Sequence, residues 1–223
     1  MQLVMPFGPS TSYEAADFIS GAGNAEALHL IERWPDWPYS MVLIHGPKGC
    51  GKTHLAHVFA ARAHATFIAP ERLGSRTADQ LLTGNHAWII DGIEGVKDAP
   101  ALAQLINHAR ARGDYVLMTS HTPAKELPFT LPDLRSRLLA LPTVALGPPD
   151  DALLMGLLAK QFADRQLRVT PDILIAAVRH IERSYEAAQG FVRQMDQLSF
   201  ERGKPISAVL LREALKNPDW QGS

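Results

Sequence analysis

Cysteine, excess charge of one sign and long apolar runs are all scarce in this sequence of 223 residues, and each scarcity excludes a class of protein. The single cysteine, Cys50, cannot form an intramolecular disulfide, which excludes a disulfide-stapled secreted domain and suits a reducing cytosol. No apolar stretch is long enough to cross a membrane, and the N-terminus lacks a basic region followed by an apolar segment. We therefore expect a cytoplasmic protein that does not act at a membrane.

Basic residues are not in excess over acidic ones. Lysine and arginine total 22 against 23 aspartate and glutamate residues, and no run of like charges occurs. A dedicated duplex-DNA-binding protein carries a basic surface, so we do not expect this chain to grip DNA strongly by itself. Its length is sufficient for one large core or for a core domain with a small second domain.

A complete phosphate-binding loop is the most informative feature that the sequence contains. Residues 46–53 read Gly-Pro-Lys-Gly-Cys-Gly-Lys-Thr, follow the apolar run 41–45 and precede a helix-compatible stretch. Glycines let successive N–H groups face the same phosphates, while Lys52 reaches the β- and γ-phosphates and Thr53 offers a hydroxyl to Mg²⁺. A glycine-rich turn that only caps a helix is the alternative, although every fixed position of the motif matches. The expected nucleotide contacts in this region are Gly46, Pro47, Lys48, Gly49, Cys50, Gly51, Lys52, Thr53 and His54.

Two later strand ends extend the expected nucleotide site. The apolar run 87–90 ends in Asp91, which we expect to hold Mg²⁺ together with Thr53, directly or through water. The run 116–118 leads into Thr119, which is expected to sense the γ-phosphate or to orient water. Either residue alone is a weak signal, because apolar strands often end in Asp or Ser at a simple turn. In this order, after a full phosphate loop, they support each other.

Strands and helices alternate along the chain up to about residue 147. This alternation predicts an α/β fold in which a five-stranded parallel sheet is covered by helices on both faces. The expected strands are 41–45, 66–69, 87–91, 115–120 and 143–146, and the expected helices are 25–33, 52–64, 78–82, 99–112 and 131–139.

Only helices are expected after the Gly-Pro-Pro-Asp element at 147–150. They are 152–165, 171–183, 185–202 and 206–217, with Asp150 as the cap of the first. The predicted organisation is a tail (1–11), an α/β nucleotide-binding domain (12–147) and a small helical domain (148–223).

Arg135 and Arg137 lie in the short helix predicted before the fifth strand. One interpretation is the solvated basic edge of an amphipathic helix. The alternative is an arginine finger, a guanidinium presented to the phosphates of a nucleotide held by a neighbouring molecule.

Together these motifs resemble the AAA+ ATPase module of the bacterial replication initiator DnaA. The resemblance is carried by residues 17–28, 46–53, 90–94, 118–120 and 134–138, and it covers the chain from Tyr13. No segment resembles the long N-terminal region or the helix-turn-helix domain of the initiator. The Hda (HdaA) family of DnaA-related regulators, an initiator-like module behind a short tail, is a closer match.

The resemblance implies an AAA+ domain with a helical lid and ADP or ATP with Mg²⁺ as ligand, and it is compatible with a homo-oligomer. It implies regulatory inactivation of DnaA, in which the chain acts as an activator of ATP hydrolysis on DnaA more than as a free-standing enzyme. Arg137 is the implied finger because it matches the arginine of the initiator family's Ser-Arg-Leu/Phe element. Arg135 is the implied interface contact.

The segment Gln2-Leu3-Val4-Met5-Pro6-Phe7 resembles the short peptide with which Hda-type proteins dock on the β sliding clamp of DNA polymerase III. In such a peptide Gln2 fills a polar niche, Leu3, Met5 and Phe7 fill apolar pockets, and Pro6 lowers the ordering cost. An apolar start that joins the sheet or stays disordered is the alternative. The implied contact with DNA is indirect, through the clamp.

Two departures from the DnaA pattern qualify these expectations. DnaA has a second acid after its Mg²⁺-binding Asp, whereas this chain has Gly92, so intrinsic ATP hydrolysis is expected to be weak or absent unless Glu94 substitutes. In the lid, Gln189 aligns with the sensor arginine of DnaA, and Arg193 follows one turn later. We therefore expect a preference for ADP more than tight control by a γ-phosphate.

Two other classes of protein use the same phosphate loop. A DnaC/IstB-like helicase loader or transposition helper would itself hydrolyse ATP on DNA, which Gly92 and the balanced charge argue against. A small-molecule kinase would consume ATP only with its acceptor, and the arginine helix and the helical lid argue against it.

Overall fold

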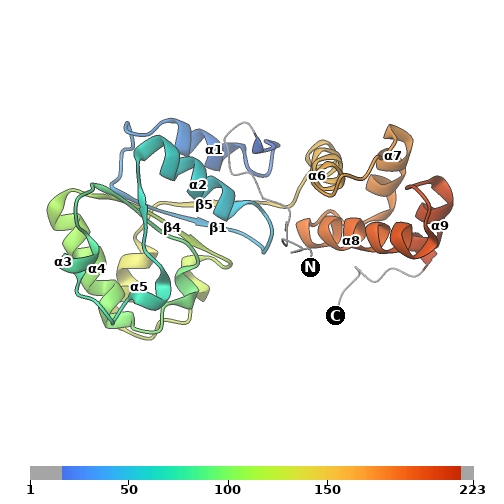
Figure 1. Ribbon diagram of the computed structural model, residues 1–223. Helices are drawn as coiled ribbons and strands as arrows, with labels where there is room; N and C mark the ends of the chain where they lie inside the picture. Colours follow the sequence, from blue (N-terminus) through green and yellow to red (C-terminus); the bar gives the residue numbers. More distant parts are fainter. Residues whose placement is uncertain (1–16, 217–223) are drawn as a thin grey trace, which may run out of the picture. The chain divides into compact units, whose positions relative to one another are not determined.

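The computed structural model describes residues 17–216, which divide after Gly147 into two compact units (Figure 1). The first unit alternates strands and helices, and the second is helical. The predicted tail, residues 1–11, lies outside the described residues. No helix between residues 17 and 216 is long and apolar enough to cross a membrane.

A five-stranded parallel sheet forms the centre of the first unit, as the alternation predicted. Its strands are β1 (Met41–His45), β2 (Thr66–Phe67), β3 (Ala87–Ile90), β4 (Tyr115–Ser120) and β5 (Thr143–Ala145), in the order β2-β3-β4-β1-β5. The register pairs His45 with Ser120 and Ile90 with Met118, so β1, β3 and β4 end at one edge of the sheet. The residues that follow these strands therefore meet there, as expected for a ligand site in an open parallel sheet.

Helices cover both faces of this sheet (Figure 1). In the figure, α1 (Ala25–Glu32) and α2 (Lys52–Ala63) lie on one face, while α3 (Ala78–Leu81), α4 (Ala99–Arg112) and α5 (Pro132–Leu139) lie on the other. Both faces of the sheet need covering because successive side chains of each apolar strand point to opposite faces. Leu43, Ile90 and Met118 share a buried core with Leu105 of α4 and Leu134 of α5.

The second unit contains four helices around its own core. They are α6 (Asp151–Asp164), α7 (Pro171–His180), α8 (Tyr185–Arg202) and α9 (Ala208–Lys216). Phe162 and Phe191 are fully buried, and their rings meet edge to face with centroids 6.3 Å apart. Asp150 caps α6 as predicted, because its Oδ1 accepts a hydrogen bond from the Leu153 N–H at 2.7 Å.

Some predicted element ends differ from the observed ones for local reasons. β2 ends at Phe67 because Pro70 begins the 3₁₀ turn η2 (Pro70–Arg72). α5 begins at Pro132 because its proline occupies the first helical position, which leaves Leu131 extended as the N-cap. α7 ends at His180 because Ile181 is extended. The last helix begins two residues later than predicted, at Ala208.

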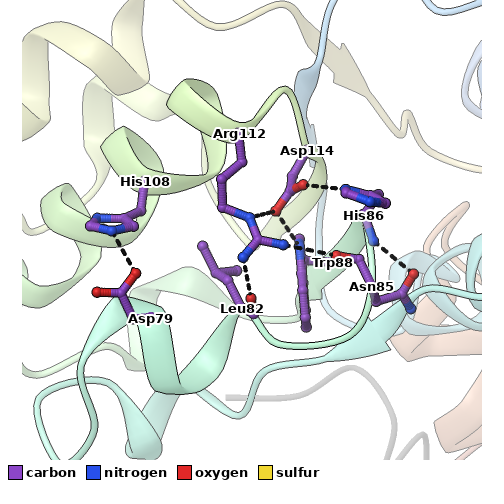
Figure 2. A network of polar contacts seen from close by, with 8 residues as sticks. All are labelled: Asp79, Leu82, Asn85, His86, Trp88, His108, Arg112 and Asp114. Carbon is purple, nitrogen blue, oxygen red and sulfur yellow. Dashed lines mark hydrogen bonds and ion pairs between the residues drawn. The ribbon is translucent and has the colours of Figure 1, made fainter.

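A buried polar cluster lies at the other edge of the sheet, where β3 and β4 begin (Figure 2). Asp114 immediately precedes β4 and is fully buried. Its carboxylate accepts hydrogen bonds from Trp88 Nε1 at 3.0 Å and Arg112 Nε at 2.9 Å, and His86 Nδ1 lies 2.9 Å from its other oxygen. Arg112 also donates to the Leu82 carbonyl at 2.6 Å. The cluster thus joins the end of α4 to the starts of two central strands.

Candidate nucleotide-binding site

The phosphate loop connects β1 to α2, as predicted. Gly49 and Gly51 have φ angles of 79° and 96°, in the left-handed region that glycine adopts without steric cost. Gly46 is required for a different reason. A Cβ atom at this position would lie only 2.7 Å from the carbonyl oxygen of Leu146, which follows β5. The loop therefore lies too close to the end of β5 for any side chain at Gly46.

Lys52 is almost fully buried at the start of α2, with 6% of its surface exposed. Its Nζ donates hydrogen bonds to the carbonyl oxygens of Gly46 at 2.7 Å and Pro47 at 2.8 Å. The ammonium is therefore held inside the loop. A buried positive charge beside a helix N-terminus favours an anionic ligand, as the sequence predicted for a phosphate.

Two titratable side chains beside Lys52 carry perturbed pKa values. Burial raises the pKa of the Cys50 thiol, and the nearby Lys52 ammonium opposes this shift only in part. Burial lowers the pKa of His45, Glu126 opposes the shift, and Lys52 adds to it. Cys50 is therefore a protonated, packed thiol at neutral pH and not a nucleophile.

Asp91, Thr53 and Thr119 are brought together from three different elements. Thr53 Oγ1 donates to Asp91 Oδ2 at 2.8 Å, and Thr119 Oγ1 donates to Asp91 Oδ1 at 2.5 Å. The Gly92 N–H in turn donates to Thr119 Oγ1 at 2.8 Å. The sequence placed these three residues in one site, and the geometry agrees with that placement.

The same oxygens fit the expected magnesium ion. Mg²⁺ prefers hard oxygen ligands and is usually held by one or two protein groups together with phosphates and water. The hydroxyl of Thr53 and the carboxylate of Asp91 supply two such oxygens, in hydrogen-bond contact with each other. Across residues 17–216 no three His, Cys, Asp or Glu residues gather in one metal-binding group. The other ligands of a magnesium ion held here would be phosphate oxygens and water.

Phe18 packs against the loop and Asn24 fixes the segment that follows Phe18, and sequence reasoning assigned neither a role. The Phe18 ring packs on Gly51, where an added Cβ would lie 3.1 Å from it, and it meets the His54 ring edge to face at 5.3 Å. Asn24 Nδ2 donates to the Ile19 carbonyl at 3.0 Å. The signal available was the Phe-x-x-Gly-x-Gly-Asn pattern just before α1, where an aromatic and a buried amide flank glycines.

Glu94 lies in the 3₁₀ turn η3 (Ile93–Gly95), which begins after Gly92 turns the chain with a φ of 76°. Its Oε1 accepts a hydrogen bond from the His121 N–H at 3.2 Å, and His121 Nε2 also lies 3.2 Å from this oxygen. Its Oε2 is buried without a hydrogen-bond partner among the residues that the structure describes. The Glu94 carboxylate, which is the nearest one in sequence to Asp91, thus contacts the residue that follows β4.

The arginine pair lies on α5, whose buried side chains are Leu134 and Leu138. Arg135 is exposed. Arg137 is partly exposed, and its Nε donates to Asp133 Oδ2 at 2.9 Å within the same helix. The guanidinium of Arg137 therefore contacts Asp133 at the surface of the first unit.

The remaining predicted contacts fall elsewhere. Gln189 is half-buried and Arg193 is exposed, both on α8 of the second unit. Arg193 lines an open hollow on that unit together with Arg165 and Phe200. The predicted clamp-binding residues, 2–7, lie outside the described part of the chain.

Comparison with known proteins identifies the fold. Residues 42–118 match the family model described as "ATPase family associated with various cellular activities (AAA)". Domain III of the Thermotoga maritima replication initiation protein DnaA superposes with a TM-score of 0.72 at 19% identity, covering 92% of this chain and 98% of that one. At such identities the likeness shows the fold alone.

Two further solved structures have the same fold. AMPPCP-bound DnaA from Aquifex aeolicus has a TM-score of 0.67 at 16% identity, covering 85% of this chain and 66% of that one. The Thermotoga maritima RuvB Holliday junction branch migration motor has a TM-score of 0.61 at 17% identity, covering 82% and 64%. The expected AAA+ fold, a five-stranded parallel sheet with helices on both faces followed by a helical region, is thereby confirmed.

Proposed function

Because an AAA+ fold similar to that of DnaA carries a complete phosphate loop here, we propose that this protein is a nucleotide-bound, Hda-type regulator of bacterial replication initiation. It acts in the cytoplasm, docks on the β sliding clamp of DNA polymerase III and promotes hydrolysis of the ATP bound to DnaA. It reaches DNA through the clamp. Its role is to prevent re-initiation, as an activator of another protein's hydrolysis.

The resident ligand in this proposal is ADP, or ATP, with Mg²⁺. The N–H groups of the loop and the Lys52 ammonium hold the phosphates, while Thr53 and Asp91 hold the metal, which neutralises phosphate charge when bound. Thr119 fixes the Asp91 carboxylate through its 2.5 Å hydrogen bond. Since Gly92 follows Asp91 and Glu94 is bonded to His121, the protein's own ATP turnover is slow.

The observation that carries the proposal is the placement of Arg137 in a DnaA-like fold. This arginine is partly exposed on α5, and Asp133 restrains its guanidinium at 2.9 Å. A restrained guanidinium loses less rotamer entropy when it meets a phosphate, and its planar fork matches phosphate oxygens. The likeness to DnaA domain III over 92% of this chain supports DnaA as the neighbour that receives it.

Substitution of Arg137 tests this function. Arginine fingers contribute on the order of 10³ to 10⁵ in rate, so Arg137→Ala should lose nearly all stimulation of hydrolysis of DnaA-bound ATP in the presence of clamp-loaded DNA. Arg137→Lys should rescue poorly, because an ammonium lacks the planar fork. Phosphate release from DnaA preloaded with radiolabelled ATP is the measurement.

Arg110→Ala is the matched control, since Arg110 is an exposed arginine on α4. It should stimulate DnaA like the wild type, and all variants should keep their melting temperature and their ADP binding. If Arg137→Ala stimulates DnaA as well as Arg110→Ala does, α5 carries only a solvated basic edge. If the isolated wild type instead hydrolyses ATP steadily and DNA accelerates it, the helicase-loader class replaces this proposal.

A further inference from the structure

A cavity of about 290 Å³ opens on the first unit beside the edge strand β5. One wall is α1, which contributes Leu30, and the opposite wall is formed by Val42 of β1 and Val144 of β5. The loop before β1 closes it with Trp37 and Tyr39. Val42 is the second residue of β1, whereas the phosphate loop follows the end of β1, and no residue of the loop lines the cavity, so the cavity is separate from the nucleotide site.

The aromatic wall of this cavity is fixed. The Trp37 ring stacks on Phe59 of α2 with centroids 4.9 Å apart, and its Nε1 donates to the Leu30 carbonyl at 2.6 Å. Tyr39, in contrast, keeps 54% of its surface exposed. A rigid apolar floor with an exposed aromatic rim suits a large apolar side chain entering from outside.

Main-chain groups of β5 that face away from β1 lie beside the cavity, whose lining includes Thr143. β5 is the last strand of the sheet, and it bonds to β1 through the Pro142 carbonyl, which accepts from the Leu43 N–H at 3.0 Å, and through the Leu146 N–H, which donates to His45 at 2.7 Å. Because main-chain groups alternate in direction along a strand, those of Thr143 face away from β1. The same holds for Ala145, two residues later. In the sheet formed by residues 17–216 no further strand pairs with this edge.

Opposite charges mark the two ends of the helical wall. Glu26 and Arg33 both line the cavity and are both exposed. They lie seven positions apart on α1 and its C-cap, which corresponds to roughly 10 Å along a helix. Neither side chain has an ion-pair or hydrogen-bond partner within the described ranges of the chain.

We propose that the β5 edge and this cavity form a binding site for an extended peptide segment of a protein partner. The peptide adds a strand to β5 by bonding to the outward main-chain groups of Thr143 and Ala145, as in β-strand addition. One large apolar side chain enters the cavity. The residues two positions before and after it share its face, and one is acidic and contacts Arg33 while the other is basic and contacts Glu26.

The spacing supports this five-residue pattern of acid, any residue, large apolar residue, any residue and base. The acidic and basic residues of the peptide are four steps apart, which is about 13 Å along an extended strand. Glu26 and Arg33 are roughly 10 Å apart along the helix, and long side chains can bridge the difference. The order of the charges sets the direction of the added strand. The site needs neither nucleotide nor clamp, so it stands apart from the proposed function.

Two fluorescein-labelled peptides test the proposal against the full chain. The first is Thr-Asp-Val-Phe-Val-Lys-Thr, and the second exchanges its Asp and Lys. Fluorescence anisotropy should give one order a Kd at least tenfold lower than the other, and replacing the peptide's Phe by Ala should weaken binding by about tenfold or more. Failure of both peptides to bind would overturn the proposal.

Two variants locate the binding. Thr143→Pro removes an outward N–H without touching the bonds to β1, and it should weaken binding by about tenfold. The exchange Glu26→Arg with Arg33→Glu should invert the preference between the two peptides. Unchanged ADP binding and melting temperature in both variants report an intact fold. If Thr143→Pro binds like the wild type, or the exchange leaves the preference unchanged, the site is not at this edge.

Discussion

Replacing Asp114 by alanine should destabilise the first unit severely without reaching the nucleotide site. The carboxylate is fully buried and bonded to Trp88 and Arg112, with His86 at 2.9 Å (Figure 2). Removing one partner of a buried ion pair costs about 3–5 kcal/mol, because it leaves the other charge unpaired. Arg112 is 34% exposed and keeps its bond to the Leu82 carbonyl, so we expect the lower end of that range at most.

The matched control is Asp79→Ala, because Asp79 forms an ion pair of similar length with His108, 2.7 Å, but on the surface (Figure 2). Its side chain is 75% exposed, against 0% for Asp114. Exposed pairs contribute about 0–1 kcal/mol, so this variant should unfold nearly like the wild type. The two expectations differ because Asp114 is buried and contacts three side chains, whereas Asp79 is exposed and forms its ion pair with His108.

Urea unfolding followed by tryptophan fluorescence measures both variants. With a slope of about 1–3 kcal/mol per molar urea, a loss of about 3 kcal/mol moves the midpoint by one molar or more. Below its transition, Asp114→Ala should still bind ADP, because Asp114 precedes β4 while Lys52 follows the end of β1. An unfolding free energy equal to that of Asp79→Ala would refute the account of the cluster.

Three further predictions concern the loop and the tail. Lys52→Ala should abolish the stabilisation by ADP that thermal unfolding measures. In the wild type this stabilisation is about 2.7 kcal/mol when the ADP concentration is about 100 times its Kd. An unchanged stabilisation in the variant would contradict the role of the ammonium. Cys50 should react with a thiol reagent far more slowly in the native than in the urea-unfolded protein, because burial raises its pKa and only 1% of it is exposed; equal rates would disprove this. Replacing Gln2, Leu3 and Phe7 together by alanine should remove clamp binding in a pull-down while ADP binding persists, each apolar anchor contributing about 1–3 kcal/mol; retained binding would reject the tail assignment.

The core of the candidate site was predictable because its determinants are local or follow from the geometry of parallel sheets. The spacing within residues 46–53 dictates where Lys52 and Thr53 lie relative to the loop. Asp91 and Thr119 each end an apolar run, and the carboxyl ends of neighbouring parallel strands meet at one edge. The bond between Arg137 and Asp133 is also readable in principle, since i and i+4 residues share a helix face.

Other parts depend on contacts through space that local patterns do not encode. Nothing around Asp114 distinguishes it from the other acidic residues between elements, because two of its partners, His86 and Trp88, are 28 and 26 positions away. Glu94 is oriented by His121, 27 positions away. Predicting the cavity beside β5 requires the order of the strands in the sheet, which the sequence pattern leaves open.

The seclusion of Lys52 has a chemical consequence for regulation by acylation. Transfer of an acetyl group to lysine needs space around the side-chain nitrogen for the incoming reagent. Lys52 lacks this space, since its nitrogen lies against the Gly46 and Pro47 carbonyls and its side chain is 6% exposed. Lys48, four residues earlier in the same loop, is exposed. Reactive acyl metabolites should therefore modify Lys48 at the rim of the loop and spare Lys52, the lysine that we propose holds the phosphates.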